Sequence, residues 1–499
     1  MINFLNSVFE NLQKFQFEEA FCISGTTYTY KNLSEHVAGI QRLLNQKKNV
    51  NTFGIIVDDN INTYAAIFAI WFNGYSFVPL NCKNPLKRNI QIINEADLEV
   101  VLISRESHNN VLTEDVDKIN LKDAEMNHNV FLNDSVEEQL AYILYTSGST
   151  GAPKGVQIQF SNLQAFIDSM FDLELKYSSG DKFLQMFDLT FDVSIACMVI
   201  PLLKGASIYT LPYGKLKFTY VFKLLKEENI NVVTIVPSLI SFLKPYINDI
   251  VFPNVNICIL TAEASYFGDI NLLKKVIPNS EIYNFYGPTE GTIWTHFYKI
   301  EDDFKNSHYH GLLSIGKPLK NIDSIIINNE KEILSDGMKG ELCLSGKQIT
   351  SGYFNNKLMN ESSFFNLSID NKVIRFYKTG DICFKNKNNN YMYCGRKDSQ
   401  IQIQGYRVEL GEIENVLRKN FKMKNVLAIA TKNISNLDVI YLFIEGLLEH
   451  NSDGQIEYFL EQNLPSYMVP KKIFYLEKFP LNSSSKIDKT KLKELIKST

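Results

Sequence analysis

The sequence predicts an α/β protein in which a large N-terminal domain of helix-covered sheets and a β-rich subdomain precede a small α+β C-terminal domain. The chain has 499 residues, which at roughly 150 residues per domain corresponds to about three units. Its composition, with 45% hydrophobic and 21% charged residues, is that of a globular protein. Helix-like and strand-like segments alternate over most of the chain and give way to short strands after about residue 322.

The N-terminal part alternates helical spacing of apolar residues with short β-branched runs that are typical of buried strands. Two helices are predicted at 33–44 and 220–228, and four strands at 52–57, 100–103, 232–236 and 256–260. Such alternation favours parallel sheets covered by helices.

Beyond residue 322 the strands become shorter and are separated by polar turns, which predicts a β-rich subdomain. Its predicted strands are 324–327, 340–344 and 386–393. After Gly395-Arg396-Lys397-Asp398 the pattern returns to α+β, with a helix at 412–418 and strands at 428–431 and 439–445. The last hundred or so residues are therefore expected to fold as a small unit of their own.

Charge and cysteine content narrow the class of protein. The net charge of -4 argues against a strongly basic nucleic-acid binder. The 7 cysteines are an odd number without a C-x-x-C pair, which fits reduced thiols in a cytoplasmic protein. The N-terminus lacks a basic region followed by an apolar core, and the most apolar stretch, 64–71, is too short to span a bilayer. We expect a soluble cytoplasmic protein with neither nucleic acid nor membrane as a partner.

The sharpest local signal is residues 145–155, Tyr-Thr-Ser-Gly-Ser-Thr-Gly-Ala-Pro-Lys-Gly, which follow a predicted strand at 140–144. Glycines let a backbone bend tightly around phosphate oxygens, hydroxyls add donors, and Lys154 supplies charge for a polyphosphate. Gly155 follows the lysine, so this is not a Walker loop. A flexible serine-glycine linker is the alternative.

Four further motifs follow in order. They are Asn284-Phe285-Tyr286-Gly287-Pro288-Thr289-Glu290, Tyr377-Lys378-Thr379-Gly380-Asp381, 395–398 continuing to 405–414, and 464–470 with the tail Lys486-Ile487-Asp488. With the loop at 145–155 they resemble the adenylate-forming (AMP-binding) superfamily, which includes acyl-CoA synthetases, luciferases and nonribosomal peptide synthetase adenylation domains. The resemblance covers most of the chain. It implies an ATP-dependent ligase with an adenylation core at 1–397 and a mobile C-terminal subdomain at 398–499.

The resemblance places ATP on three motifs, and each motif suits that task chemically. An aromatic face such as Tyr286 can stack on adenine, Asp381 can accept hydrogen bonds from ribose hydroxyls, and Glu290 is a hard oxygen ligand for Mg²⁺. A structural turn with a solvated glutamate, and an aspartate in a surface turn, are the alternatives. The implied nucleotide-binding residues are Thr146, Ser147, Gly148, Ser149, Thr150, Gly151, Lys154, Asn284, Tyr286, Thr289, Asp381 and Arg396.

Adenylation builds charge between a carboxylate and a polyphosphate, and fixed cations must offset that charge. Lys486 matches the catalytic lysine of the family, and Thr146, Lys154 and Glu290 complete the implied catalytic set. The usual Asn-Gly before the lysine is Ser484-Ser485 here.

Asp398 matches the hinge about which the C-terminal domain of the family turns between adenylation and thioester-forming states. Two family-typical basic positions after the hinge are Gln402 and Gln404 in this sequence. These departures could alter contacts with a thiol-bearing partner.

Phe191-Asp192-Val193-Ser194 is similar to the amino-acid-activating branch, in which the aspartate pairs with the α-ammonium of the substrate. The alternative is that Asp192 only caps a helix that begins near Val193. Substrate-pocket positions transferred from adenylation domains are Asp192, Val193, Ala196, Thr234, Leu260, Ala262, Phe285, Ile293, Trp294 and Lys486.

The resemblance therefore implies a free-standing enzyme of nonribosomal peptide synthesis type. It would convert an amino acid and ATP to aminoacyl-AMP and pyrophosphate, then load the phosphopantetheine of a separate carrier protein. The layout is also similar to D-alanine:carrier-protein ligases, for which Phe285 and Trp294 could make the pocket small. A carboxylic acid:CoA ligase stays open as an alternative, and a non-enzymatic binding module is disfavoured because Lys154, Glu290, Asp381 and Lys486 are all present.

Overall fold

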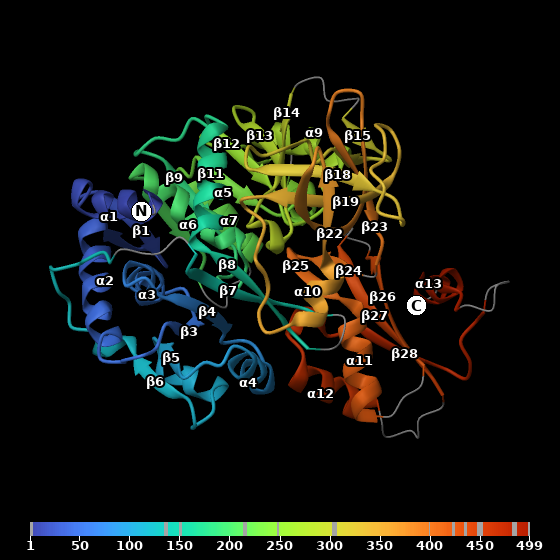
Figure 1. The fold of residues 1–499 in the computed structure, drawn as a ribbon, viewed down its shortest axis with the longest axis horizontal. Helices are drawn as coiled ribbons and strands as arrows, with labels where there is room; N and C mark the ends of the chain where they lie inside the picture. Colours follow the sequence, from blue (N-terminus) through green and yellow to red (C-terminus); the bar gives the residue numbers. More distant parts are fainter. Residues whose placement is uncertain are drawn as a thin grey trace.

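The structure of the chain is a computed structural model. This structure describes residues 3–133, 138–148, 152–212, 217–246, 249–301, 307–398, 400–421, 425–433, 437–446, 453–481 and 487–497. Figure 1 shows two large sheets with their helices in the blue to yellow part of the chain and a smaller orange to red part beside them. Ser149, Thr150, Gly151, Ser484, Ser485 and Lys486 lie outside the described residues.

The first large sheet has 7 strands in the order β20-β8-β7-β4-β3-β5-β6. Its strands are β3 (Thr52–Val57), β4 (Ser76–Asn81), β5 (Val100–Ile103), β6 (Asp117–Asn120), β7 (Leu140–Thr146), β8 (Lys154–Gln159) and β20 (Gly352–Tyr353). β3 to β6 pair in parallel, whereas β7 and β8 form an antiparallel pair. The β-branched runs at 52–57 and 100–103 are therefore strands, as predicted.

The second large sheet has 9 strands in the order β17-β14-β13-β12-β11-β9-β10-β1-β2. Its strands are β1 (Glu19–Ile23), β2 (Thr26–Thr29), β9 (Lys182–Gln185), β10 (Ser207–Thr210), β11 (Val232–Ile235), β12 (Ile257–Leu260), β13 (Glu281–Tyr286), β14 (His296–Ile300) and β17 (Lys317–Pro318). β11, β12 and β13 run parallel to one another, so their carboxyl ends share one edge.

Helices cover both sheets. They are α1 (Asn3–Lys14), α2 (Tyr30–Leu44), α3 (Ile61–Phe72), α4 (Leu86–Glu95), α5 (Phe160–Asp172), α6 (Val193–Lys204), α7 (Lys217–Glu227), α8 (Ser238–Leu243) and α9 (Phe267–Val276). The apolar stretch 64–71 lies in α3, where every residue except Asn62 is buried, because this helix packs in the shared core of the two sheets. No helix among the described residues is long and apolar enough to cross a membrane.

The β-rich subdomain contains β18 (Ile322–Ile327), β19 (Gly340–Gly346), β21 (Phe364–Ile369), β22 (Lys372–Lys385), β23 (Tyr391–Arg396) and the helix α10 (Lys357–Ser363). A short hairpin, β15 (His308–Tyr309) and β16 (Leu312–Leu313), lies nearby in the sequence. The strand predicted at 386–393 starts only at Tyr391. Asn386 accepts hydrogen bonds from the N–H groups of Asn388 and Asn390, which makes this segment a turn.

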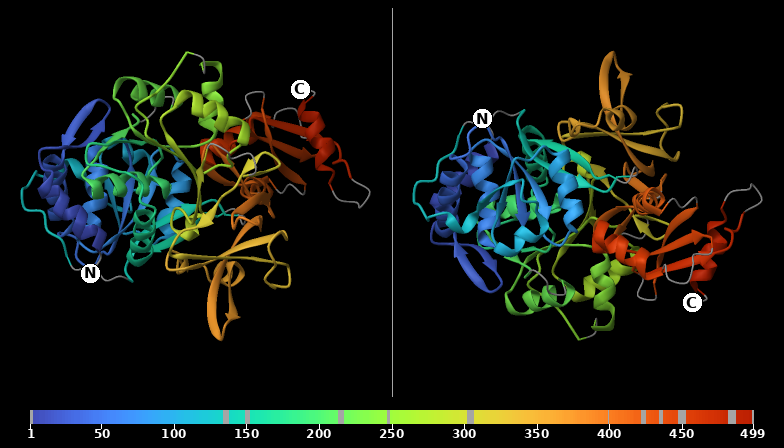
Figure 2. Two further views of the ribbon diagram at one scale, coloured as in Figure 1. Left: turned by 90° about the horizontal axis from the view of Figure 1, so that it is seen from above. Right: turned by 90° about the horizontal axis from the view of Figure 1, so that it is seen from below.

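The small C-terminal domain contains β24 (Gln400–Ile403), β25 (Tyr406–Glu409), α11 (Leu410–Phe421), β26 (Val426–Lys432), β27 (Asp438–Glu445), α12 (Asp453–Asn463), β28 (Lys472–Leu476) and α13 (Lys489–Lys497). In both views of Figure 2 this red end of the chain lies at the side of the larger domain. The α/β fold with a large and a small domain is confirmed.

The hydrophobic clusters are separate in the two domains. Two clusters contain only residues from Ile401 onward, and the remaining clusters of described residues end at Tyr393. This separation supports a boundary near Asp398. The division at 397/398 stays a prediction.

Leu442→Ala tests that division. Leu442 is completely buried in the core of the C-terminal domain, and such truncations cost about 2–5 kcal/mol. We expect hydrogen exchange in urea to show earlier opening of residues 398–499 with little change in residues 1–397. Tyr458→Ala, on an exposed position of α12, is the control. Equal loss of protection in both segments would mean that they unfold as one cooperative unit.

Candidate functional site

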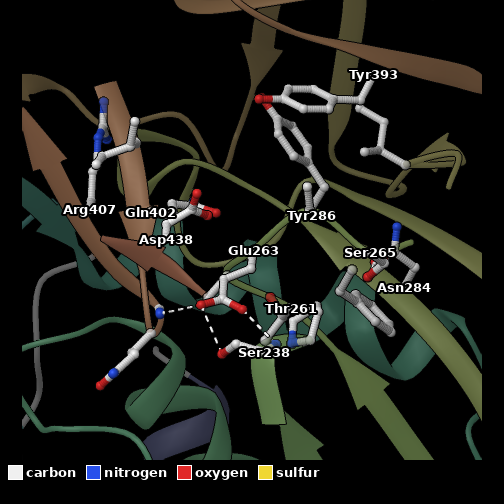
Figure 3. A pocket seen from close by; sticks show the side chains of 18 of the residues that line it. Ser238, Thr261, Glu263, Ser265, Asn284, Tyr286, Tyr393, Gln402, Arg407 and Asp438 are labelled. Carbon is white, nitrogen blue, oxygen red and sulfur yellow. Dashed lines mark hydrogen bonds between the residues drawn. The ribbon is translucent and has the colours of Figure 1, made fainter. Parts of the chain in front are cut away.

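A cavity of about 340 Å³ lies at the carboxyl ends of β11, β12 and β13 and is closed on one side by the β24–β25 hairpin. Ligands of open α/β sheets bind at this edge, because the loops that follow parallel strands converge there. Figure 3 shows residues of both domains around this space, among them Tyr286, Glu263 and Arg407. The candidate site is therefore shared by the two domains.

The predicted phosphate loop connects β7 to β8, whose ends pair at Thr146 and Lys154. The hydroxyl of Thr146 is buried and has no hydrogen-bond partner among the described residues. Ser147 and Gly148 instead contact the C-terminal domain. The Ser147 hydroxyl donates to the Arg407 carbonyl at 2.8 Å, and the Gly148 N–H donates to Glu412 at 3.1 Å.

Glu290 lies on a short 3-10 helix, η4 (Thr289–Gly291), and is completely buried. Its carboxylate accepts hydrogen bonds from Arg407 and from the Tyr353 hydroxyl, both at 2.7 Å, and lies 3.5 Å from Lys154 Nζ. Burial alone would raise the pKa of Glu290, but Arg407 and Lys154 outweigh it and hold the pKa well below its usual range. The alternative of a solvated glutamate is therefore wrong.

Lys154 is buried beside this carboxylate, and its Nζ lies 5.1 Å from the centre of the Tyr353 ring. Burial and the charge of Arg407 lower the pKa of Lys154, while Glu290 opposes that change. The structure thus brings Lys154 and Glu290 together although they lie far apart in the sequence.

Asp381, Arg396 and Asp398 form one charged network with Tyr286. The Asp381 carboxylate accepts from the Tyr286 hydroxyl and from Arg396, the latter at 3.0 Å. The same guanidinium donates twice to Asp398, at 2.9 and 2.6 Å. Burial raises the pKa of Asp381, and Arg396 opposes this rise. The predicted ribose and hinge residues are thus physically linked, and Asp381 is buried rather than in an exposed turn.

Asn284 and Thr289 also line the cavity. The Asn284 amide oxygen accepts from the Ser265 hydroxyl at 2.7 Å, and its NH₂ donates to the Ser314 carbonyl at 2.8 Å. These bonds fix the side chain and leave one amide hydrogen for another acceptor.

Asp192 lines the cavity at the start of α6 and is 7% exposed. Its side chain makes no capping hydrogen bond, so the helix-cap alternative is not supported. Burial raises the pKa of Asp192 to about 7, and the neighbouring Thr289 hydroxyl partly opposes the rise. Among the described residues its Oδ2 has no hydrogen-bond partner. The residue thus lines the cavity with one carboxylate oxygen that is buried and has no hydrogen-bond partner among the described residues.

Only some of the predicted substrate-pocket residues line the cavity. Val193, Ala262 and Phe285 line it together with Asp192. Five further predicted positions are buried but do not line the cavity: Ala196, Thr234, Leu260, Ile293 and Trp294. The Trp294 ring lies 4.7 Å from that of Phe285 between ring centres, and its N–H donates to the Thr261 hydroxyl at 2.8 Å. Trp294 therefore packs against Phe285 and supports this aromatic wall of the cavity from the side away from the cavity.

The backbone around this wall is strained. Thr292 and Ile293 have φ of 58° and 71°, a left-handed conformation that β-branched residues rarely adopt. Gly287 faces them so closely that a Cβ would lie 2.4 Å from the Ile293 carbonyl oxygen. Such strain persists only where the surrounding packing enforces it, and it often marks ligand sites.

Several residues at the site had no role assigned from the sequence. Glu263 lies in the loop after β12 and accepts hydrogen bonds from the Ser238 N–H at 2.8 Å and the Gly405 N–H at 2.9 Å (Figure 3). Its position after a predicted parallel strand was the available signal. Arg407 and Glu412 lie within a recognised motif, but their partners are distant in the sequence and only the fold shows them.

Gln402 and Gln404, the positions that depart from the family pattern, both line the cavity. Figure 3 shows Gln402 between Arg407 and Asp438 at the C-terminal side of the space. The departures therefore lie at the site itself. The proposed roles of Ser149, Thr150, Gly151 and Lys486 fall outside the described residues.

Comparison with known proteins gives a consistent result. A model of the family described as AMP-binding enzyme matches residues 8–354. The D-alanine--D-alanyl carrier protein ligase of Bacillus licheniformis is 29% identical over 84% of this chain and 84% of that protein. Zwittermicin A synthase ZmaJ of Bacillus cereus is 30% identical over 95% of this chain and 91% of that protein.

Among solved structures, the Vibrio cholerae adenylation domain AlmE in complex with glycyl-adenosine-5'-phosphate has a TM-score of 0.88 and 22% identity. The match covers 100% of this chain and 98% of that chain, and at this identity it shows the fold. Because the family model spans more than half of the sequence, this chain belongs to the AMP-binding enzyme family and is an adenylate-forming ligase that uses ATP.

Proposed function

We propose that the protein activates an amino acid with a small side chain. The substrate carboxylate attacks the α-phosphorus of ATP, pyrophosphate leaves, and aminoacyl-AMP remains in the site. The aminoacyl group then passes to the phosphopantetheine thiol of a separate carrier protein. The observation that carries this proposal is the buried carboxylate of Asp192, which has an unpartnered oxygen at the cavity wall.

Asp192 is the proposed partner of the substrate ammonium. Burial raises the pKa of the Asp192 carboxyl to about 7, and an ammonium beside it would favour the charged form. A site built around such a pair rejects an analogue that lacks the amine, because the carboxylate is then left unpaired. This distinguishes an amino acid ligase from a carboxylic acid:CoA ligase.

The small side chain is proposed from the wall behind the ammonium site. Phe285 faces the cavity with Trp294 packed behind it, and five of the transferred pocket positions do not reach the cavity. This packing favours a small side chain. The likeness to a D-alanine--D-alanyl carrier protein ligase favours alanine or glycine as candidates and supports a carrier protein as acceptor.

The nucleotide is proposed to lie between Tyr286 and the loop at 145–155. Tyr286 offers a ring face to adenine, Asp381 and Arg396 would hold the ribose, and Asn284 and Thr289 lie along the same wall. The loop residues Thr146, Ser147, Gly148, Ser149, Thr150, Gly151 and Lys154 would hold the phosphates. The unpartnered Thr146 hydroxyl supports this assignment.

Mg²⁺ is proposed to bind Glu290. Among the described residues no group of three or more His, Cys, Asp or Glu could hold a metal by itself. Mg²⁺ in nucleotide sites is bound by one or two carboxylates together with phosphate oxygens, which one buried carboxylate beside a phosphate loop fits. The ion would neutralise charge on the leaving pyrophosphate. Thr146, Lys154 and Lys486 would provide the remaining catalytic donors and positive charge.

Asp398 is proposed as the hinge. Its bonds to Arg396 join the last strand of the large domain to the first residues of the small one. A rotation there would need changes at only a few residues. The adenylation core would then be residues 1–397 and the mobile domain residues 398–499.

Amino-acid-dependent exchange of pyrophosphate into ATP tests the function. We expect exchange with glycine or with D- or L-alanine, and almost none with acetate or propionate, the matched acids without an amine. Asp192→Ala should reduce exchange about 100-fold or more, because removing one partner of a buried ion pair costs roughly 3–5 kcal/mol. Asp172→Ala, which removes a carboxylate from an exposed ion pair, is the control.

Equal activation of alanine and propionate by the wild type would show that Asp192 does not bind the amine. CoA-dependent release of AMP with propionate would then favour the CoA ligase.

The raised pKa of Asp192 predicts a pH-dependent stability. The pKa of this carboxyl is about 7 in the folded protein and 3.8 in the unfolded chain. Its contribution to the free energy of unfolding is therefore fully present below pH 4, decreases as the pH rises from 4 to 7, and is lost above pH 7. Asp192→Asn removes that dependence. We expect its free energy of unfolding, relative to wild type, to increase by about 2 kcal/mol from pH 5.5 to pH 8, measured by urea unfolding without ligands. A constant difference across this range would mean that Asp192 is ionised throughout.

Asp381→Ala should raise the KM for ATP by roughly tenfold or more, since hydrogen bonds to charged groups contribute about 1.5–3 kcal/mol. Steady-state exchange at varied ATP measures this effect. Asp381→Asn keeps the shape and one acceptor, so it should be affected less. If the KM for ATP did not change in either variant, the ribose would have to be held by other residues.

A further inference from the structure

Gln348 is a completely buried polar residue that binds the strained loop at 291–294. It lies between β19 and β20, where the chain passes from the β-rich subdomain to the seven-stranded sheet. Its side-chain Nε2 donates to the Trp294 carbonyl at 2.8 Å and to the Gly291 carbonyl at 3.3 Å. Its backbone carbonyl accepts from the Thr292 hydroxyl. One glutamine thus binds the loop at three points, including the residues directly before and after the left-handed pair.

The orientation of the Gln348 amide follows from these partners. Both side-chain partners are carbonyl oxygens, which only accept hydrogen bonds, so the NH₂ group has to face them. The amide oxygen, Oε1, is buried and has no hydrogen-bond partner among the described residues. The side chain of Gln348 therefore serves the loop as a donor.

The backbone on both sides of Gln348 is itself fixed. Asn162, in the first turn of α5, is buried and donates from Nδ2 to the Lys347 carbonyl at 2.8 Å and to the Ile349 carbonyl at 3.2 Å. The glutamine therefore projects from an anchored segment. Its side chain can hold the loop in place because its own backbone is held by a helix of the large domain.

The conformation of the loop decides where Trp294 lies. Thr292 and Ile293 keep φ of 58° and 71° only because the surrounding packing enforces these angles. Trp294 follows them directly, packs on Phe285 at 4.7 Å between ring centres, and donates to the Thr261 hydroxyl at 2.8 Å. Phe285 and Thr261 both line the cavity. The position of this part of the cavity wall therefore depends on the loop.

We propose that Gln348 is a positioning residue for substrate selection: it holds Trp294 against Phe285 and thereby keeps the pocket for the amino acid side chain small. The inference rests on the proposed function, because it takes the Phe285 wall as the boundary of that pocket. Without the two amide donors the loop relaxes toward ordinary backbone angles, Trp294 leaves its place against Phe285, and a larger side chain is admitted. Glu290, directly before the loop, keeps the hydrogen bond from the Thr350 N–H to its carbonyl at 2.9 Å, so nucleotide binding should change little.

Pyrophosphate exchange with amino acids of different size tests this role. Gln348→Met keeps the length of the side chain and removes both donors. We expect kcat/KM for leucine relative to alanine to rise about tenfold over wild type, since a few methylene groups in an apolar pocket have effects of this size. The KM for ATP should stay within about twofold of the wild-type value, because no group on the nucleotide side is removed. Gln13→Met, on an exposed position of α1, is the matched control and should change neither quantity.

A double-variant cycle shows whether Gln348 acts through Trp294. Trp294→Ala should by itself raise the leucine-to-alanine ratio. If Gln348 acts by holding Trp294, Gln348→Met should add little to this ratio in the Trp294→Ala background. Effects that multiply in the double variant would mean that the two residues act independently, and this result would overturn the proposal.

Tryptophan fluorescence gives a readout that needs no substrate. The chain has 2 tryptophans, Trp71 and Trp294, so in Trp71→Phe the emission comes from Trp294 alone. Trp294 is buried. We expect Gln348→Met in this background to shift the emission to longer wavelength and to increase its quenching by acrylamide. If Trp71→Phe does not fold, the same difference is measured between Gln348→Met and wild type, which share Trp71.

The proposal is also overturned if Gln348→Met leaves either the leucine-to-alanine ratio or the quenching of Trp294 at its wild-type value. A wild-type protein that activates no amino acid would instead refute the proposed function, and the fluorescence would still test whether Gln348 holds Trp294. Gln348→Asn keeps the amide on a side chain shorter by one methylene group and should give intermediate values. It replaces Gln348→Met if that variant does not fold, and wild-type values in Gln348→Asn then count against the proposal in the same way.

Discussion

The buried carboxylate of Glu290 is the interaction on which the arrangement of the site depends. A carboxylate that is removed from water must be paired and hydrogen-bonded, and Glu290 meets this need with Lys154, Tyr353 and Arg407. These partners come from β8, β20 and β25, so one side chain joins the antiparallel end of the seven-stranded sheet to the C-terminal domain. Loss of any one of them would leave the remaining charges poorly compensated.

The charged network of Asp381, Arg396 and Asp398 connects the two domains at their boundary, as Glu290 does at the cavity. Its members bind across two strands of the β-rich subdomain and reach the first residues of the small domain. A ligand that contacts Asp381 or Arg396 therefore alters the bonds available to Asp398. This network gives a physical connection from the cavity wall at Asp381 to the first residues of the C-terminal domain.

The pocket for the substrate shows how packing limits what a motif can assign. Positions transferred from related domains identify Asp192, Val193, Ala262 and Phe285, which line the cavity. Ile293 and Trp294 belong to the same set but are buried and do not line the cavity, and residues 292 and 293 adopt left-handed backbone angles close to Gly287. A sequence motif specifies residue types and their spacing. It does not specify the backbone conformation of a strained loop, which determines which side chains line the cavity.

The sequence by itself determined the α/β class and the main strands, and its motifs predicted a phosphate loop at 145–155 and site carboxylates at Asp192 and Glu290. These features depend on local periodicity and on short motifs, both of which can be identified in the sequence alone. Only the tertiary structure decided that Arg407 and Lys154 share Glu290, that Glu412 meets Gly148, and that the predicted strand at 386–393 begins as an asparagine turn. Ion pairs between residues more than one hundred positions apart depend on how sheets and domains pack, because burial and not sequence spacing selects which opposite charges must meet.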